Sequence, residues 1–118
     1  MNVHNLSSLK DYWHKHSTAR KGLELWYADV TSKHWKIPNA VKKDYARASI
    51  IGNNRVVFDI KGNDFRLVVE LNYQKGWAIV KFIGTHAEYD KIDAETIDLY
   101  KKKKKNKEKY PKQKKEKK

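Results

Sequence analysis

The chain has no cysteine among its 118 residues, so disulfide bonds and thiolate metal sites are excluded. The first residues, Met1–Leu6, contain no long apolar stretch, and we therefore expect neither a signal peptide nor a membrane span. A glycine-rich phosphate loop, a nucleophile elbow and a paired-carboxylate pattern are also missing. A chain of this length fits one domain with one modest core, which argues against a large multi-site enzyme.

Negative charge is scarce at one end of the chain. Residues 101–118 hold 12 lysines against two glutamates, a net charge of +10, whereas residues 1–100 carry a net +3 of the total +13. We predict a folded domain over residues 1–100 and a disordered lysine-rich tail over residues 101–118, because a block of like charges repels itself. Such a tail raises affinity for any polyanion. Its first five lysines are therefore candidate RNA contacts: Lys101, Lys102, Lys103, Lys104 and Lys105.

The first part of the chain has apolar residues at helical spacing. Ser7 or Ser8 is expected to cap a first helix and Ser17 or Thr18 a second one, and Pro38 should open a short third helix. The tryptophans invite an assignment to base stacking, but their positions favour burial. We therefore assign all four to the core: Trp13, Trp26, Trp35 and Trp77.

The middle of the chain has the alternation of β-strands. Apolar residues alternate in Arg55–Ile60 and Phe65–Leu71, and Trp77–Ile83 is a nearly continuous apolar run. The links between these segments are short and rich in turn formers, which predicts a three-strand antiparallel meander. The central strand is apolar on both faces, so both need cover, and the N-terminal helices are the obvious cover for one. With a short helix expected over Asp93–Tyr100, the fold class is α+β.

The segment after the third strand, Gly84–Asp90, carries titratable side chains at a strand end, where loops on a rigid sheet often hold functional groups. Histidine titrates near neutral pH, so His86 is a candidate general acid or base. A structural alternative is a turn in which His86 caps backbone groups and Tyr89 closes the edge of the core.

Two cationic residues interrupt the strands. Arg66 lies on the face opposite Phe65 and Leu67, and its planar guanidinium suits two-point binding of phosphate. An ion pair with Glu70, or with a charge on a neighbouring strand, explains Arg66 as well. Lys81 either adds charge to a phosphate site or protects an edge strand from association.

Three motifs occur in order: Arg55-Val-Val-Phe-Asp-Ile60, then Gly62-Asn-Asp-Phe-Arg66, then Phe82-Ile-Gly-Thr-His-Ala-Glu-Tyr-Asp-Lys-Ile92. Together they resemble the HigB toxin family of the RelE superfamily over about residues 5–98, while the lysine tail is not part of the pattern. The resemblance implies a RelE-like fold, cleavage of mRNA on the ribosome in the cytoplasm, and a helix-turn-helix antitoxin of the HigA type as partner.

The resemblance also implies which residues carry the chemistry. Four positions match the polar residues of the family motifs: Arg66, His86, Tyr89 and Asp90. A metal-independent ribonuclease without a cofactor needs a base, a positive group for the phosphate and an acid. Arg66 would hold the phosphate, His86 or Tyr89 would move a proton, and Lys81 or Lys91 would add charge. The alternative function is a non-catalytic RNA- or ribosome-binding protein that acts through its basic tail.

Overall fold

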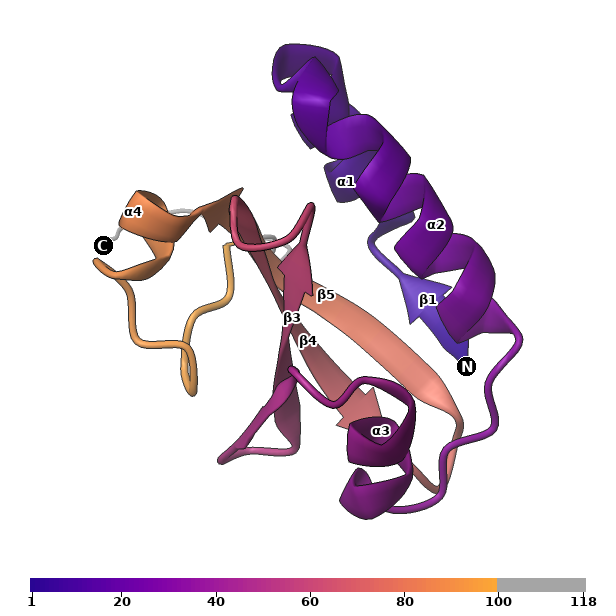
Figure 1. The fold of residues 1–118 in the computed structure, drawn as a ribbon. Helices are drawn as coiled ribbons and strands as arrows, with labels where there is room; N and C mark the ends of the chain where they lie inside the picture. Colours follow the sequence, from indigo (N-terminus) through magenta and orange to yellow (C-terminus); the bar gives the residue numbers. More distant parts are fainter. Residues whose placement is uncertain (100–118) are drawn as a thin grey trace, which may run out of the picture.

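The computed structural model describes residues 1–99, so the lysine tail predicted over residues 101–118 lies outside the described residues. The strands of the described part are β1 (Asn2–His4), β2 (Ser49–Ile51), β3 (Arg55–Ile60), β4 (Phe65–Asn72) and β5 (Trp77–Thr85). They form one five-stranded sheet in the order β1-β5-β4-β3-β2, drawn at the centre of Figure 1. The sheet is mixed, because β1 runs parallel to β5 and every other pair is antiparallel.

The three-strand meander is present as β3, β4 and β5, but the prediction that it forms the whole sheet was wrong. The edge strands β1 and β2 each have three residues. So short a segment cannot show a two-residue period, and its pairing partner decides its conformation. The α+β class is confirmed.

The helical elements of the described part are α1 (Leu6–Lys15), the 3₁₀ turn η1 (Ser17–Ala19), α2 (Arg20–Thr31), α3 (Pro38–Asp44) and α4 (His86–Tyr89). The three N-terminal helices are confirmed, and Pro38 opens α3 as predicted. The predicted serine and threonine caps were wrong. The residue before α1 is Asn5, which has a left-handed φ of 70° and donates its side-chain amide to the Val80 carbonyl at 3.0 Å.

The helix expected over Asp93–Tyr100 is also wrong across its described residues, where residues 93–99 form turns. Ala94 and Ile97 of this stretch are partly buried without a helix. Ile92, Ala94 and Ile97 pack onto the sheet from an irregular segment. Apolar spacing over so short a stretch cannot separate these two arrangements.

The first face of the sheet carries the main core. Figure 1 shows α1 and α2 along this side of the sheet. Trp13, Trp26 and Trp35 are buried there, as predicted, whereas Trp77 is only partly buried and meets the ring of His4 at 5.1 Å between centroids. The strands contribute Val56, Phe58, Ile60, Phe65, Leu67, Val69, Leu71, Ala78, Val80 and Ile83.

A β-bulge in β5 explains why that strand reads as a continuous apolar run. Val68 pairs with Phe82 and Val69 pairs with Val80, so Lys81 is the extra residue. After the bulge the alternation changes phase. Val80 and Ile83, three positions apart, therefore reach the same core.

The second face of the sheet is smaller and is covered by the segment that follows β5. Val57, Val68 and Phe82 form its apolar centre, and Tyr89 packs against it together with Ile92, Ala94 and Ile97. Figure 1 shows α4 and the orange-to-yellow segment after it on the side of the sheet away from α1 and α2. The expectation that both faces are covered is confirmed.

Candidate functional site

Arg66 lies on the second face of the sheet, as predicted, at the end where β5 runs into α4. It aligns with Asp59 on β3 and with Gly84 on β5. Its Nη1 lies 3.1 Å from Asp59 Oδ1 and donates to the Asn63 carbonyl at 3.4 Å. Of the two predicted alternatives, the ion pair with Glu70 was wrong, and the ion pair with a charge on a neighbouring strand is confirmed by Asp59 on β3. Glu70 is four residues along the same strand from Arg66, about 13 Å at about 3.3 Å per residue, whereas Cβ atoms directly opposite on the next strand are about 5 Å apart.

Part of the Arg66 guanidinium reaches the surface, with 15% of the side chain exposed. Both of its contacts use Nη1, and no residue among 1–99 is a hydrogen-bond or ion-pair partner of Nε or Nη2. The centre of the guanidinium lies 5.9 Å from the centroid of the Tyr89 ring, within the range of a cation–π contact. The carboxylate and the ring therefore hold Arg66 in place while two nitrogens remain able to donate to a phosphate.

The position of α4 is fixed by a capping box and by a glycine. Glu88 accepts from the backbone N–H of Thr85 at 2.8 Å, and the Thr85 hydroxyl accepts from the backbone N–H of Glu88 at 3.1 Å. A Cβ on Gly84 would lie 2.6 Å from Phe82 Cζ and 2.9 Å from Glu88 Oε1. Any larger residue at position 84 would therefore displace the Phe82 ring or the Glu88 carboxylate of the capping box.

His86 is the first residue of α4, and it lies open to solvent at the rim of the site. Its backbone N–H donates to the Asp64 carbonyl at 3.2 Å, and its Nδ1 lies 3.1 Å from Asp90 Oδ2. The side chain of His86 is 46% exposed. Thr85, rather than His86, caps the helix. With a carboxylate at Nδ1, the nitrogen left for proton exchange is Nε2.

The structure brings the three predicted catalytic residues to one corner of the molecule. Tyr89 contacts Arg66, and His86 lies three positions before Tyr89, on the same side of the helical turn. His86 also follows Gly84, the cross-strand partner of Arg66, by two residues. Among residues 1–99, no group of three or more His, Asp or Glu side chains is placed to hold a metal ion.

The lysines proposed as RNA contacts have different surroundings. Lys81 has a side chain only 14% exposed, and its Nζ lies 3.3 Å from Asp98 Oδ2. This ion pair connects the C-terminal segment, residues 90–99, to β5. Lys91 is exposed directly after α4 and its Asp90 neighbour. The five tail lysines, 101–105, lie outside the described residues.

Sequence reasoning missed the carboxylate that positions Arg66. Asp59 also lies 3.4 Å from Nη2 of Arg47, an exposed side chain on the segment before β2. Asp59 therefore bridges two guanidinium groups, and it lines a cleft of about 330 Å³ beside Arg47 and Tyr45. The signal was available, because the predicted turn after Ile60 sets Ile60 opposite Phe65 and so Asp59 opposite Arg66.

Arg55 is the other residue that sequence reasoning missed. It is the one charged or polar residue among 1–99 that is buried, with 6% of its surface exposed. Its Nη1 donates to the carbonyls of Ala94 and Ile97 at 3.0 and 2.6 Å, and its Nε lies 3.4 Å from Glu70 Oε1. Arg55 therefore holds the C-terminal segment against the second face.

A protein-family model described as HigB_toxin, RelE-like toxic component of a toxin-antitoxin system, matches residues 19–92. Arg66, His86 and Tyr89 lie inside that range. No curated protein matches the chain. In the part of the chain that the structure describes, no helix is both long and apolar enough to cross a membrane.

Proposed function

Because the chain belongs to the HigB family of RelE-like toxins, we propose that it is a ribosome-dependent mRNA endoribonuclease that stops translation. Family membership makes it the toxic component of a toxin–antitoxin system and implies an antitoxin partner. In this proposal the antitoxin is a helix-turn-helix protein of the HigA type. The site of action is the cytoplasm, where ribosomes hold the message.

One observation carries the proposal. The partly covered guanidinium of Arg66, with two nitrogens that have no partner among residues 1–99, lies at the same corner of the molecule as the His86–Asp90 pair. Metal-independent cleavage of RNA needs these kinds of group. A base takes the proton of the 2′-hydroxyl, and the 2′-oxygen then attacks the adjacent phosphorus. The bond from phosphorus to the 5′-oxygen breaks, and an acid returns a proton to that oxygen. Arg66 would neutralise the charge that develops on the phosphate.

The surroundings of His86 and Tyr89 suggest how the proton transfers divide between them. Asp90, next to Nδ1, favours the tautomer with its proton on that nitrogen, which leaves Nε2 of His86 to act as the base. Tyr89 is the second group at this corner with a transferable proton, and we assign it the leaving oxygen. Its ring also limits the movement of Arg66, so loss of Tyr89 would disturb two functions.

The family match and the corner geometry favour catalysis, whereas the lysine tail alone would favour simple RNA binding. The two functions depend on different residues. A nuclease depends on His86, and a binding protein depends on its lysines. A single substitution at an exposed histidine therefore separates them without a large effect on folding.

The experiment is inducible expression of the full chain, with and without its antitoxin, followed by mapping of mRNA 5′ ends. We expect growth arrest with new ends inside translated regions for the natural protein, and neither for His86→Gln. His14→Gln is the matched control, since His14 is an exposed histidine on α1. Growth arrest that survives His86→Gln, or arrest without new mRNA ends, would show a non-catalytic binding protein instead.

A further inference from the structure

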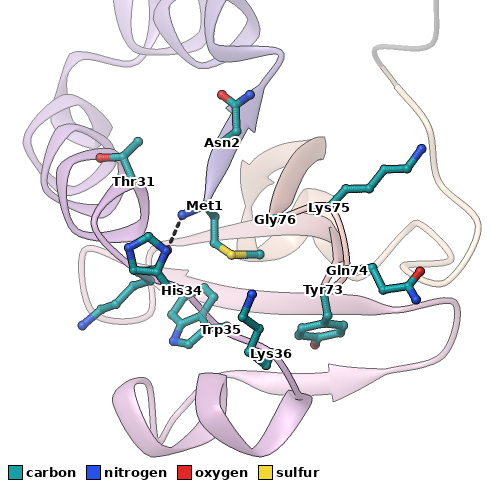
Figure 2. Close-up of a pocket in the computed structure, with 11 residues that line it drawn as sticks. Met1, Asn2, Thr31, His34, Trp35, Lys36, Tyr73, Gln74, Lys75 and Gly76 are labelled. Carbon is teal, nitrogen blue, oxygen red and sulfur yellow. Dashed lines mark hydrogen bonds between the residues drawn. The ribbon is translucent and has the colours of Figure 1, made fainter.

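A second concave region opens at the end of the sheet where β4 turns into β5. It is a cleft of about 550 Å³ between residues 33–36, which follow α2, and the turn 73–76, with Met1 and Asn2 beside them. Figure 2 shows His34, Trp35 and Lys36 on one side, Tyr73 and Gln74 on the other, and Met1 between them. Tyr73 is seven positions after Arg66, which at about 3.3 Å per strand residue puts the two about 23 Å apart.

The charge of this cleft has one sign. Three lysines and a histidine line it, and none of its lining residues is acidic. Lys33 is occupied, because its Nζ lies 3.6 Å from Asp29 and 3.5 Å from Asp44. Lys36 and Lys75 are exposed, and neither has a carboxylate partner among residues 1–99. The cleft therefore has a lysine without a carboxylate partner on each side, although Nζ of Lys75 also lies 4.8 Å from the centroid of the Trp77 ring.

Both sides of the cleft are held in place before any ligand arrives. Trp35 is buried and donates its indole N–H to Asp44 at 2.8 Å, which fixes the segment that carries Lys36. On the other side, Asn72 Oδ1 accepts from the backbone N–H of Lys75 at 2.9 Å. A charged site that is already ordered loses less conformational entropy when it binds.

Neutral hydrogen-bonding groups lie beside the lysines. The Tyr73 hydroxyl is protonated at neutral pH, burial raises its pKa further, and it can donate to an oxyanion. Gln74 and Asn2 add amide groups to the lining. Such a mixture of cations, hydroxyls and amides is typical of surfaces that contact the phosphates and sugars of a nucleic acid.

We propose that this cleft binds the sugar–phosphate backbone of RNA, as a docking site separate from the Arg66 corner. The assignment rests on the proposed function, which brings the protein to an RNA-rich partner. An acidic protein segment fits less well, because peptide recognition usually uses an apolar anchor in a pocket. The exposed large apolar side chains among residues 1–99 are Leu25, Ile37, Ile50 and Leu99, and none of them lines the cleft.

A docking contact of this kind supplies affinity without chemistry. Each phosphate contact to single-stranded RNA contributes about 0.7 to the slope of log affinity against log salt. Loss of the two contacts from Lys36 and Lys75 should therefore lower that slope by about 1.4.

The test measures binding of the full chain to a single-stranded 2′-O-methyl oligoribonucleotide over a range of salt concentrations. This probe has no free 2′-hydroxyl, so its binding can be measured whether or not the protein is a nuclease. The test variant is Lys36→Gln with Lys75→Gln. The matched control is Lys10→Gln with Lys21→Gln, which removes the same charge from exposed helical positions outside the cleft.

We expect the slope to fall by about 1.4 in the test variant and to change little in the control. Equal decreases in both variants would overturn the proposal, because net charge alone would then explain binding. Displacement of the probe by polyglutamate as effectively as by unlabelled oligonucleotide would also overturn it, in favour of an acidic protein partner. New mRNA ends in cells with no slope difference would refute only the docking site, whereas a slope difference without new ends would refute only the nuclease.

Discussion

Two arginines share the second face of the sheet, one at each end of the β3–β4 pair, and the fold uses them differently. Each is directly opposite a carboxylate, Arg55 opposite Glu70 and Arg66 opposite Asp59. Arg55 also donates to two carbonyls of the C-terminal segment and is buried. Arg66 is covered on one side by a tyrosine ring and keeps two nitrogens without a partner among residues 1–99.

The difference comes from what lies above each arginine. The irregular segment after α4 brings backbone carbonyls to Arg55, whereas α4 itself brings a side-chain ring to Arg66. The two carbonyl oxygens accept from Nη1 of Arg55, whose side chain is 6% exposed, whereas the tyrosine face accepts no hydrogen bond from Arg66, whose side chain is 15% exposed. One arginine therefore stabilises the fold, and the other remains able to bind an anion.

The largest effect on stability is expected from Arg55→Ala. The change leaves the carbonyls of Ala94 and Ile97 without their donor in a partly buried region, and each such acceptor left unsatisfied costs about 1–3 kcal/mol. Urea unfolding followed by circular dichroism measures the loss. Arg66→Ala is the control and should lose clearly less. Equal losses of stability at the two positions would show that Arg55 and Arg66 do not differ in their contribution to the fold.

A smaller effect on stability is expected from Gly84→Ala, next to Arg66 on the neighbouring strand. The new methyl group would meet Phe82 Cζ at 2.6 Å and Glu88 Oε1 at 2.9 Å, so the Phe82 ring or the Glu88 carboxylate of the capping box must move. Overpacking of this kind costs about 1–3 kcal/mol. Because α4 carries His86 and Tyr89, we expect RNA cleavage per folded molecule to fall as well. Unchanged cleavage at an unchanged melting temperature would show that the close approach of α4 is unimportant.

The smallest effects are expected at two lysines. Lys91→Gln should lower the salt slope of RNA binding by about 0.7, the value of one phosphate contact to a single strand. Lys81→Gln should leave that slope nearly unchanged, because Lys81 is paired with Asp98. A larger slope change at Lys81 than at Lys91 would show that RNA displaces Asp98.

Much of the fold was predictable because the alternation of apolar residues along one strand and the effect of proline on the backbone are both local signals. The alternation in β3 and β4 placed Arg66 on the face opposite Leu67, and Pro38 marked the start of α3. β1 was not predictable in this way. Its three residues pair with Trp77–Ile79, far along the chain, and no short pattern reports such a partner.

The candidate site was predictable in its members but not in its contacts. His86 and Arg66 were candidates from their places at the end of one strand and within another, and Tyr89 from motif resemblance, and the structure supplied the ring contact between Tyr89 and Arg66. Glu70 was considered as the partner of Arg66 because it is near in sequence, whereas cross-strand register decides such pairs. The buried role of Arg55 depends on where residues 94–97 pack, which local sequence does not indicate.

The most direct test of the account compares Arg66→Lys with Arg55→Lys in single-turnover cleavage of a ribosome-bound message, with melting temperatures measured in parallel. Lysine keeps the charge but loses the planar set of donors. We expect Arg66→Lys to fold normally and to cleave about 10²–10³ times more slowly, by analogy with loss of one preorganised donor to a developing charge. Arg55→Lys should melt lower yet cleave at the natural rate per folded molecule. Near-normal cleavage by a well-folded Arg66→Lys would contradict the account and remove Arg66 from the site.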